Sequence, residues 1–444
     1  MTTENLSRLR QGHLAGVQRL DLSHCGLTEF PREVFQLADS LEILDLSGNR
    51  LDRLPDDLHR LSRLQAIFCS DNRFTELPPA LGRCERLDMV GFKACRIVEV
   101  PAAALPPMLR WLILTDNRIE SLPDELGRRP RLQKLMLAGN RLSALPETLA
   151  DARALELLRI AANRFDRLAP WLVRLPRLSW LAWGGNPEGA AAQMAPDLPL
   201  VTVGWSDLRL GPVLGEGASG VIHRVDRMVD GLPQPAALKV FKGAVTSDGL
   251  PDTEMAACMA AGTHPGLIGA TARVSGHPEG RPALLMPLVG PQWRILAGPP
   301  SLRSCTRDVY PEETRLDPVY ILQIARDIAG AVDHLHRRGL LHGDLYAHNI
   351  LVNKDGRAKL GDFGAASFLP AGNGPLSENL QRLEVRAFGC LLEELRQHGG
   401  GMQADPVMQQ LRPIEAACLS ADNAGRPLFP QIESALRAIA PVQP

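Results

Sequence analysis

The chain of 444 residues is longer than one ordinary hydrophobic core organises, so we expect two domains. With 49 basic and 50 acidic residues the formal net charge is −1, which gives no electrostatic footprint for binding nucleic acid or an anionic membrane surface. The eight cysteines include no Cys-x-x-Cys pair, so neither a zinc site nor a disulfide framework is indicated.

The sequence offers no feature that would direct it to or across a membrane. Residues 1–16 are polar and lack the apolar core of a secretory signal peptide. No later stretch runs for about 18 apolar residues without a charge, which is the length a membrane-spanning helix needs. With scattered cysteines that suit a reducing compartment, these features predict a cytoplasmic protein.

The first half of the sequence repeats itself. Residues 41–55 and 132–146 both follow the pattern Leu-x-x-Leu-x-Leu-x-x-Asn-x-Leu-x-x-Leu-Pro. The asparagine position recurs at steps of 22 to 24 residues as Cys25, Asn49, Asn72, Cys95, Asn117, Asn140, Asn163 and Asn186. One repeat cannot bury its leucines alone, whereas stacked repeats share a continuous core. The pattern predicts about eight turns of a leucine-rich-repeat solenoid, an α/β horseshoe, over residues 1–188.

Two roles are expected on this solenoid. Each asparagine or cysteine should lie at the bend after a strand and bond backbone groups there, so we assign it no ligand. The strand positions beside the second leucine should face solvent, where polar residues are usual. Eight of these positions instead form an apolar "concave ribbon": Ile43, Phe68, Met89, Trp111, Ile113, Met136, Leu157 and Trp180.

The composition of the concave ribbon predicts a docking surface. Tryptophan and methionine are typical anchors of protein interfaces. We therefore expect a protein or peptide partner on this face. The alternative is that the second domain, or a second copy of the chain, covers it. Residues 189–204, which include an alanine- and proline-rich stretch, are expected as a linker before a second domain at 205–444.

Two motifs in the second domain together predict a phosphoryl-transfer site. Residues 342–349 read His-Gly-Asp-Leu-Tyr-Ala-His-Asn, and residues 362–364 read Asp-Phe-Gly. Between them, residues 350–352 and 358–360 are predicted to pair as a hairpin around an Asp-Gly turn. That hairpin would bring Asn349 and Asp362 side by side to ligate Mg²⁺, while Asp344 would accept a hydroxyl proton.

This order of motifs resembles the catalytic loop and metal loop of the protein kinase family. The resemblance covers roughly residues 208–439 and implies a bilobal α+β fold that uses ATP and Mg²⁺. The motif Gly-Glu-Gly-Ala-Ser-Gly at residues 215–220 lies between two apolar runs, so it is predicted to be a hairpin that covers phosphates. The resemblance implies nucleotide contacts at Leu214, Gly215, Gly217, Gly220, Ile222, Ala237, Lys239, Pro287 and Val289.

Several further positions follow from the same resemblance. Lys239 would hold the α- and β-phosphates, with Glu254 on a predicted helix at 251–261 as its partner and Asp252 as a competitor. Asp317 followed by proline predicts the start of another helix that ends before Gly339. In the predicted central helix at 383–395, Glu384 takes the place of the family's usual aspartate.

The chain also departs from the protein kinase pattern. Gly343 replaces the arginine before the catalytic aspartate, Tyr346 replaces a lysine common in serine/threonine kinases, and the segment after Gly364 is short. The His-Gly-Asp triplet is similar to that of aminoglycoside phosphotransferases. We expect an ATP-dependent protein kinase with serine or threonine as the favoured acceptor. A small-molecule phosphotransferase and a pseudokinase scaffold stay as alternatives, and the oligomeric state is left open.

Overall fold

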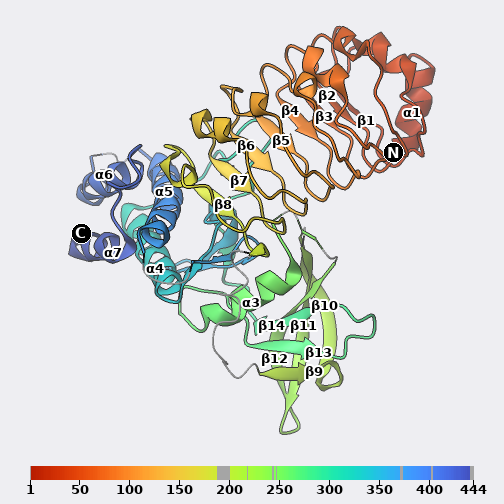
Figure 1. The fold of residues 1–444 in the computed structure, drawn as a ribbon. Helices are drawn as coiled ribbons and strands as arrows, with labels where there is room; N and C mark the ends of the chain where they lie inside the picture. Colours follow the sequence, from red (N-terminus) through yellow and green to blue (C-terminus); the bar gives the residue numbers. More distant parts are fainter. Residues whose placement is uncertain are drawn as a thin grey trace. The chain divides into compact units, whose positions relative to one another are not determined.

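The computed structural model describes residues 2–187, 201–217, 219–242, 245–246, 248–370, 374–401 and 404–440. Its chain divides into two compact units, Met1–Arg177 and Leu178–Pro444. Figure 1 shows their helices and strands coloured along the sequence.

The first unit is a solenoid of short parallel strands, as its repeats predict. Each repeat contributes one strand of three residues: β1 (Arg19–Asp21), β2 (Ile43–Asp45), β3 (Ala66–Phe68), β4 (Met89–Gly91), β5 (Trp111–Ile113), β6 (Lys134–Met136) and β7 (Leu157–Arg159). The eighth repeat strand, β8 (Trp180–Ala182), is last in the sheet order and falls in the second unit. Equivalent residues pair in register, so the buried leucine, isoleucine or valine at each strand centre stacks on the next.

Short 3-10 helices return the chain from one strand to the next. They are η1 (Arg32–Leu37), η2 (Leu58–Arg60), η3 (Pro79–Arg83), η4 (Ala102–Ala104), η5 (Asp124–Leu126), η6 (Glu147–Asp151) and η7 (Leu172–Arg174). A proline directly precedes five of them, where its fixed φ and missing N–H suit a helix start. At the N-terminal end, α1 (Thr2–Arg10) packs beside β1 and buries Leu9.

The regularly spaced asparagines have the structural role expected from the sequence. Asn117 Nδ2 donates to the carbonyl oxygens of Phe92 and Leu114 at 2.8 and 2.9 Å, and its Oδ1 accepts from the Ile97 N–H at 2.9 Å. The same set of bonds recurs at Asn49, Asn72, Asn140 and Asn163. These side chains therefore satisfy buried backbone groups in neighbouring repeats.

Most of the concave ribbon in the first unit is accessible. Five of its residues are half-buried: Ile43, Phe68, Trp111, Ile113 and Met136. The prediction of a solvent-facing side chain is wrong for Met89 and Leu157, which are 7 and 3% exposed. Parallel strands lie about 4.8 Å apart, so large side chains on a neighbouring strand shield smaller ones. Met89 is in register with Trp111, and Leu157 is in register with Lys134.

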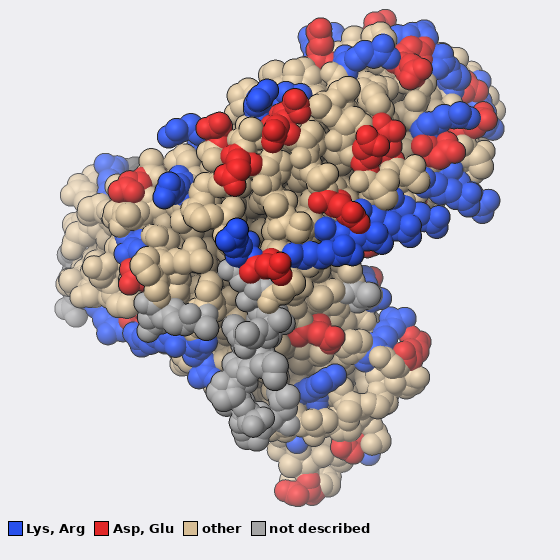
Figure 2. Space-filling model, viewed as in Figure 1, with Lys and Arg blue, Asp and Glu red and all other residues tan. Residues whose placement is uncertain are grey.

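An "arginine row" runs along one edge of the solenoid. Six successive repeats place an arginine directly after the asparagine or cysteine at the bend, and all six are exposed: Arg50, Arg73, Arg96, Arg118, Arg141 and Arg164. Figure 2 shows basic side chains following one long edge of the solenoid. The near-zero net charge of the chain thus hides a local basic surface.

The second unit contains a six-stranded sheet in the order β10-β11-β12-β14-β13-β9. Its strands are β9 (Thr202–Gly204), β10 (Leu208–Glu216), β11 (Gly220–Val229), β12 (Leu232–Phe241), β13 (Ala272–Ser275) and β14 (Ala283–Pro287). Val225, Leu238 and Leu285 form the centre of its apolar core. The sheet begins inside the predicted linker, because β9 pairs with β13. The rest of that linker, residues 189–200, lies outside the described residues.

The remainder of the second unit is mainly helical. Its helices are α3 (Pro251–Ala261), α4 (Pro318–Arg337), α5 (Pro375–Gln397), α6 (Pro406–Cys418) and α7 (Phe429–Ala438). Asp317 caps α4 by accepting the Val319 N–H at 2.8 Å, as the sequence predicts. The central helix α5 starts earlier than predicted, because Pro375 supplies a favourable first residue after Gly374. In Figure 1, α4 to α7 form a cluster separate from the sheet, which gives the expected two-part α+β architecture.

Small sheets join the helical part to the catalytic motifs. They contain β15 (Arg294–Ile295), β16 (Leu340–Leu341), β17 (Ile350–Val352), β18 (Ala358–Leu360) and β19 (Ser367–Phe368). Strands β17 and β18 are the hairpin predicted from the sequence. Among the described residues, no helix has both the length and the apolar character needed to cross a membrane.

Replacing Asn117 by alanine should destabilise the first unit. The change removes a hydrogen-bond partner from three backbone N–H groups and three carbonyl oxygens, and each group that stays unsatisfied costs about 1–3 kcal/mol. Urea unfolding followed by circular dichroism should show a loss of about 2–4 kcal/mol. The neighbouring exposed Arg118→Ala is the matched control, and an equal effect in both variants would contradict the proposed role.

Candidate catalytic site

The hairpin β17–β18 brings the two predicted motifs together. Gly361, which precedes Asp362, donates its N–H to the carbonyl oxygen of Asn349 at 2.9 Å. Asn349 Nδ2 in turn donates to Asp344 Oδ2 at 2.8 Å and to the Asp344 carbonyl oxygen at 3.0 Å. The amide of Asn349 therefore orients the carboxylate of Asp344, which stays half-exposed beside it.

Asp362 is held in an unusual backbone conformation. Its φ is 57°, in the left-handed region that a non-glycine residue rarely adopts. Its Oδ1 accepts from the Gly364 N–H at 3.2 Å, while Phe363 is buried with its ring 5.2 Å from that of His342. The side chain of Asp362 stays 52% exposed, so its carboxylate is available to a ligand.

Lys239 joins the sheet to this site. From β12 it forms a buried ion pair with Glu254 on α3, and its Nζ lies 3.8 Å from Asp362 Oδ1. The competitor Asp252 is exposed. Burial raises the pKa of Glu254 to about 7, and the Lys239 ammonium opposes this rise. Burial alone would lower the pKa of Lys239, but the charges of Asp362 and Glu254 raise it, so this lysine stays a cation.

The glycines of the β10–β11 hairpin differ in what they have to accommodate. At Gly220 a Cβ would come within 2.6 Å of the Val240 carbonyl oxygen, so packing of the protein itself requires glycine there. At Gly215 and Gly217 a Cβ would meet nothing within 4 Å. Packing within the protein therefore does not require glycine at these two positions. Because they carry no side chain, there is space over the loop that phosphates could occupy.

The other predicted nucleotide contacts lie on and around the sheet. Ile222 is paired with Lys239, and Ala237 is two residues from Lys239, so all three share one face of the sheet. Leu214 on β10 is half exposed, at 50%. Pro287 ends β14 and is exposed, and Val289 just beyond it is half-buried. Ile222 and Ala237 thus lie on the same sheet face as Lys239, where the sequence predicts nucleotide contacts.

A buried carboxylate from α5 supports the catalytic loop. Glu384 Oε1 accepts the Gly343 N–H at 2.8 Å, and its Oε2 accepts the His342 N–H at 3.3 Å and lies 2.8 Å from His336 Nε2. Burial would raise the pKa of Glu384, but the bonds from His336 and Gly343 outweigh it and lower the pKa. His342 itself binds the Gly361 carbonyl oxygen through Nε2 at 2.9 Å, which is a structural role.

The last repeat strand β8 also contacts the catalytic loop, and it belongs to the same compact unit. The ring of Trp180 stacks on that of Tyr346, with centroids 4.3 Å apart and an interplanar angle of 7°. Its Nε1 donates to the Leu345 carbonyl oxygen at 3.0 Å. The prediction that Trp180 is a solvent-facing partner anchor is therefore wrong. The side chain is only 1% exposed, because the catalytic loop covers it.

Sequence reasoning missed the pair His348 and Asp308. His348 Nδ1 lies 2.7 Å from Asp308 Oδ1, and the His348 N–H donates to Asp308 Oδ2 at 3.0 Å. Burial lowers the pKa of His348, but the bond to Asp308 and the charge of Asp344 raise it overall. Asp308 lies 40 residues upstream in a segment without regular pattern, so no feature of the sequence pointed to it.

The donor set suits the cofactors implied by the sequence. The exposed carboxylate of Asp362 and the side-chain oxygen of Asn349 are the hard oxygen ligands that Mg²⁺ prefers. Lys239 supplies a fixed positive charge 3.8 Å from one of them, where phosphate oxygens would gather. The open space at Gly215 and Gly217 fits the same ligand.

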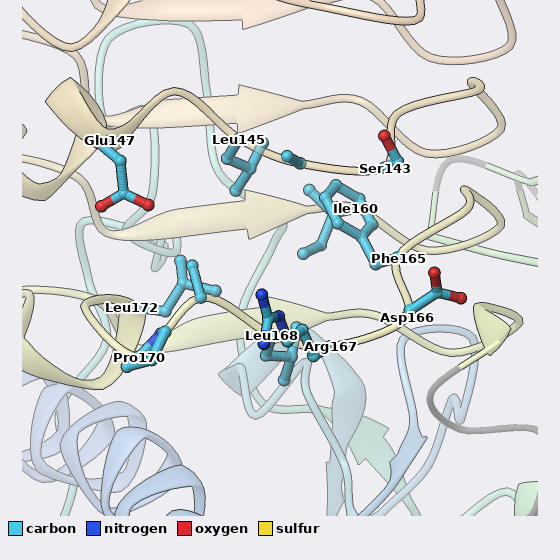
Figure 3. A pocket seen from close by; sticks show the side chains of 12 residues that line it. Ser143, Leu145, Glu147, Ile160, Phe165, Asp166, Arg167, Leu168, Pro170 and Leu172 are labelled. Carbon is cyan, nitrogen blue, oxygen red and sulfur yellow. The ribbon is translucent and has the colours of Figure 1, made fainter.

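A pocket of about 540 Å³ in the first unit is no competitor for this site. Figure 3 shows Leu145, Ile160 and Phe165 along its apolar floor, with Asp166 and Arg167 at its rim. A smaller pocket occupies the equivalent position four repeats earlier, around Leu54 and Glu76. Because the hollow recurs with the repeat, it follows from stacking of the repeats and contains no cluster of catalytic groups.

Comparison with protein families gives two matches. A family model described as protein tyrosine and serine/threonine kinase matches residues 208–386. A leucine-rich-repeat model matches residues 15–74 and 107–165. The kinase range lies within the second unit, and the two repeat ranges lie within the first.

Individual relatives are similar over limited ranges. A probable cyclin-dependent kinase 9 of Caenorhabditis elegans is 30% identical over 24% of this chain and 28% of its own length. The serine/threonine-protein kinase A-Raf of Sus scrofa is 26% identical over 27% of each chain. The tyrosine-protein kinase receptor torso of Bombyx mori is 27% identical over 28% of this chain and 20% of its own. The chain thus spans less than a third of these relatives.

Among solved structures, a leucine-rich-repeat protein of Leptospira interrogans is 29% identical to this chain. That likeness covers 41% of this chain and 46% of the other, with a TM-score of 0.38.

Replacing Glu384 by glutamine should weaken the catalytic loop in a pH-dependent way. The folded pKa of Glu384 is lowered, so its carboxylate stabilises the fold above its unfolded pKa near 4.5, and this contribution is lost as pH falls. At pH 7 the variant should lose about 1–3 kcal/mol of unfolding free energy. The difference from wild type should shrink below about pH 4.5. Thermal unfolding across pH measures this, and the exposed Glu378→Gln should behave like wild type throughout.

Proposed function

We propose that this protein transfers the γ-phosphate of ATP to a protein hydroxyl. Its N-terminal part carries leucine-rich repeats, and its C-terminal part carries a protein tyrosine and serine/threonine kinase domain. One observation carries this proposal. Lys239, paired with Glu254, lies 3.8 Å from Asp362, and the hairpin joins Asp362 to the Asn349–Asp344 pair. Phosphate, metal and base functions are thereby present together.

The proposed reaction uses these groups in distinct roles. The acceptor oxygen bonds to the γ-phosphorus while the bond to the departing ADP oxygen breaks, and the hydroxyl proton goes to Asp344. The Asn349 amide keeps the Asp344 carboxylate in one orientation. Lys239 holds phosphate oxygens by charge, while Glu254 fixes the position of its ammonium. Asn349 and Asp362 would hold Mg²⁺, which would neutralise phosphate charge.

Serine or threonine is the acceptor we favour. Tyr346 lies two residues after Asp344 but is buried under the ring of Trp180, so its ring is not available to stack on a tyrosine acceptor. The segment between Gly364 and α5, which we call the activation segment and which builds a peptide platform in protein kinases, is also brief, since α5 already begins at Pro375.

The repeat unit is proposed to recruit the protein partner. The half-buried part of the concave ribbon, with Trp111 near its centre, offers apolar anchors. The arginine row lies along the edge of the same solenoid. A partner segment that combines apolar and acidic side chains would match both features.

Two aspartate variants test the catalytic assignment. Asp344→Asn should abolish phosphate transfer, at least 100-fold, since removal of a general base costs about 10²–10⁴. It should leave ATP affinity nearly unchanged. Asp362→Asn should instead remove the Mg²⁺-dependent part of ATP binding, because it takes away a metal ligand. Transfer of labelled phosphate and calorimetric ATP titration with and without Mg²⁺ measure these effects.

The acceptor assay includes serine, threonine and tyrosine peptides, a generic protein and a panel of small hydroxyl and amino compounds. Wild-type turnover by Asp344→Asn would refute the base assignment. Transfer to small molecules alone would favour the phosphotransferase alternative, and ATP binding without any transfer would favour a scaffold.

The recruitment proposal makes a separate prediction. Fluorescence polarisation with synthetic peptides should show tighter binding of acidic-apolar peptides than of basic or uncharged ones. Trp111→Ala should weaken this binding by on the order of 2 kcal/mol. The double variant Arg96→Glu, Arg118→Glu should weaken it further and reduce its dependence on salt. Arg128→Glu, exposed after η5, is the control for total charge. Equal binding of acidic and basic peptides would contradict the proposed partner.

A further inference from the structure

The β8 segment, residues 180–184, contacts both the catalytic loop and the stretch that follows Gly364. On the catalytic loop it fixes two consecutive residues. The Trp180 ring stacks on Tyr346 in a nearly parallel arrangement, and its indole N–H bonds to the Leu345 carbonyl oxygen. Trp180 and Tyr346 are 1 and 4% exposed, so this contact is dry. A rigid, desolvated contact of this kind restrains the loop that contains Asp344.

The same segment captures the activation segment through Ser367. The hydroxyl oxygen of Ser367 accepts the N–H groups of Trp183 and Gly184 at 3.1 and 3.2 Å. It also donates to the Ala365 carbonyl oxygen at 3.3 Å. Ser367 is 0% exposed, and β19, which contains it, pairs with β16 just before the catalytic loop. A phosphate could not enter this position without displacing β8.

The position before Asp344 has no space for a side chain. Gly343 has φ 74°, and a Cβ there would come within 2.5 Å of the Ala365 carbonyl oxygen and 2.9 Å of the Leu181 carbonyl oxygen. Leu181 belongs to β8. Gly343 is thus enclosed by the activation segment on one side and by β8 on the other. The segment takes the space in which an arginine could otherwise reach out to a phosphorylated residue.

We propose that residues 180–184 are a built-in anchor that holds the activation segment and the catalytic loop in place, so that catalysis does not depend on phosphorylation of the activation segment. Trp180 and Ser367 are its positioning residues. Phosphorylation orders such segments elsewhere through one to three charge-assisted hydrogen bonds. Here two backbone N–H groups and one aromatic stack provide the restraint. This inference rests on the proposed kinase function.

The main test compares Trp180→Ala and Trp180→Phe with wild type. Loss of the ring should release the loop and lower kcat on the order of 10- to 100-fold, since small misplacements of catalytic groups have effects of this size. The KM for ATP should stay within about two-fold, because the nucleotide contacts lie on the sheet. Trp180→Phe keeps a ring to stack but loses the indole donor, so it should recover part of kcat. Trp205→Ala, a half-buried tryptophan beside the sheet of the same unit, is the matched control.

Hydrogen exchange gives a readout that does not need turnover. Trp180→Ala and Ser367→Ala should raise amide exchange in residues 343–346 and 365–369 and leave β11 and β12 unchanged. Gly343→Ala should act on the same two stretches through its clash, which keeps the test open if Trp180→Ala fails to fold. Wild-type protein treated with phosphatase should retain full activity.

Three results would overturn the anchor: unchanged exchange in folded Trp180→Ala, unchanged kcat in that variant, or a phosphatase-treated wild type that regains activity only when its activation segment is phosphorylated. The proposed kinase function fails separately. If wild type transfers phosphate to no acceptor while exchange rises in the variants as described, the anchor is present and the catalytic proposal is wrong.

Discussion

The buried carboxylate of Glu384 is the constraint on which the catalytic site depends. A carboxylate at 3% exposure is very costly unless several donors satisfy it. The donors available to it are the backbone N–H groups of His342 and Gly343 and the ring of His336. Two consecutive N–H groups can converge on one carboxylate only if the chain turns sharply there. The need to satisfy Glu384 thus fixes the loop that carries Asp344 relative to α5.

A chain of hydrogen bonds connects Glu384 and its loop to the rest of the site. His342 reaches over to the Gly361 carbonyl oxygen, and Gly361 bonds to Asn349, which orients Asp344. The loop that contains Asp362 and the side chain of Asp344 are therefore parts of one hydrogen-bonded circuit anchored on α5. Lys239 approaches from the sheet, and its Nζ lies 3.8 Å from Asp362 Oδ1.

The sequence predicted the features that depend on local periodicity or on contiguous motifs. The repeat strands, the bonds of the asparagines, the β17–β18 hairpin, and helices α3 and α4 are of this kind, because neighbouring residues determine them. The positions that escaped prediction depend on contacts between distant segments. Asp308 meets His348 across 40 residues, and β9 joins a sheet through β13 although its own sequence reads as linker.

Trp180 shows where periodicity stops being informative. The repeat pattern correctly places its side chain away from the leucine core, and the same position in the fifth repeat, Trp111, remains half-buried. Nothing in the repeat says what lies opposite that face. The residue that packs on it is Tyr346, which the sequence showed only as a departure from the kinase pattern. Trp180 and Tyr346 lie far apart in the chain, and the stacking of their rings explains why each position carries an aromatic residue.

Gly343 and β8 also bear on how the activity could be regulated. An arginine at position 343 would serve a reversible contact that a second enzyme could switch by adding or removing phosphate. A strand of the same chain is present at a fixed effective concentration and cannot be removed in this way. Regulation of the proposed kinase would then act on contacts that can still be broken. The Lys239–Glu254 pair is one such contact, because it connects α3 to β12 beside Asp362.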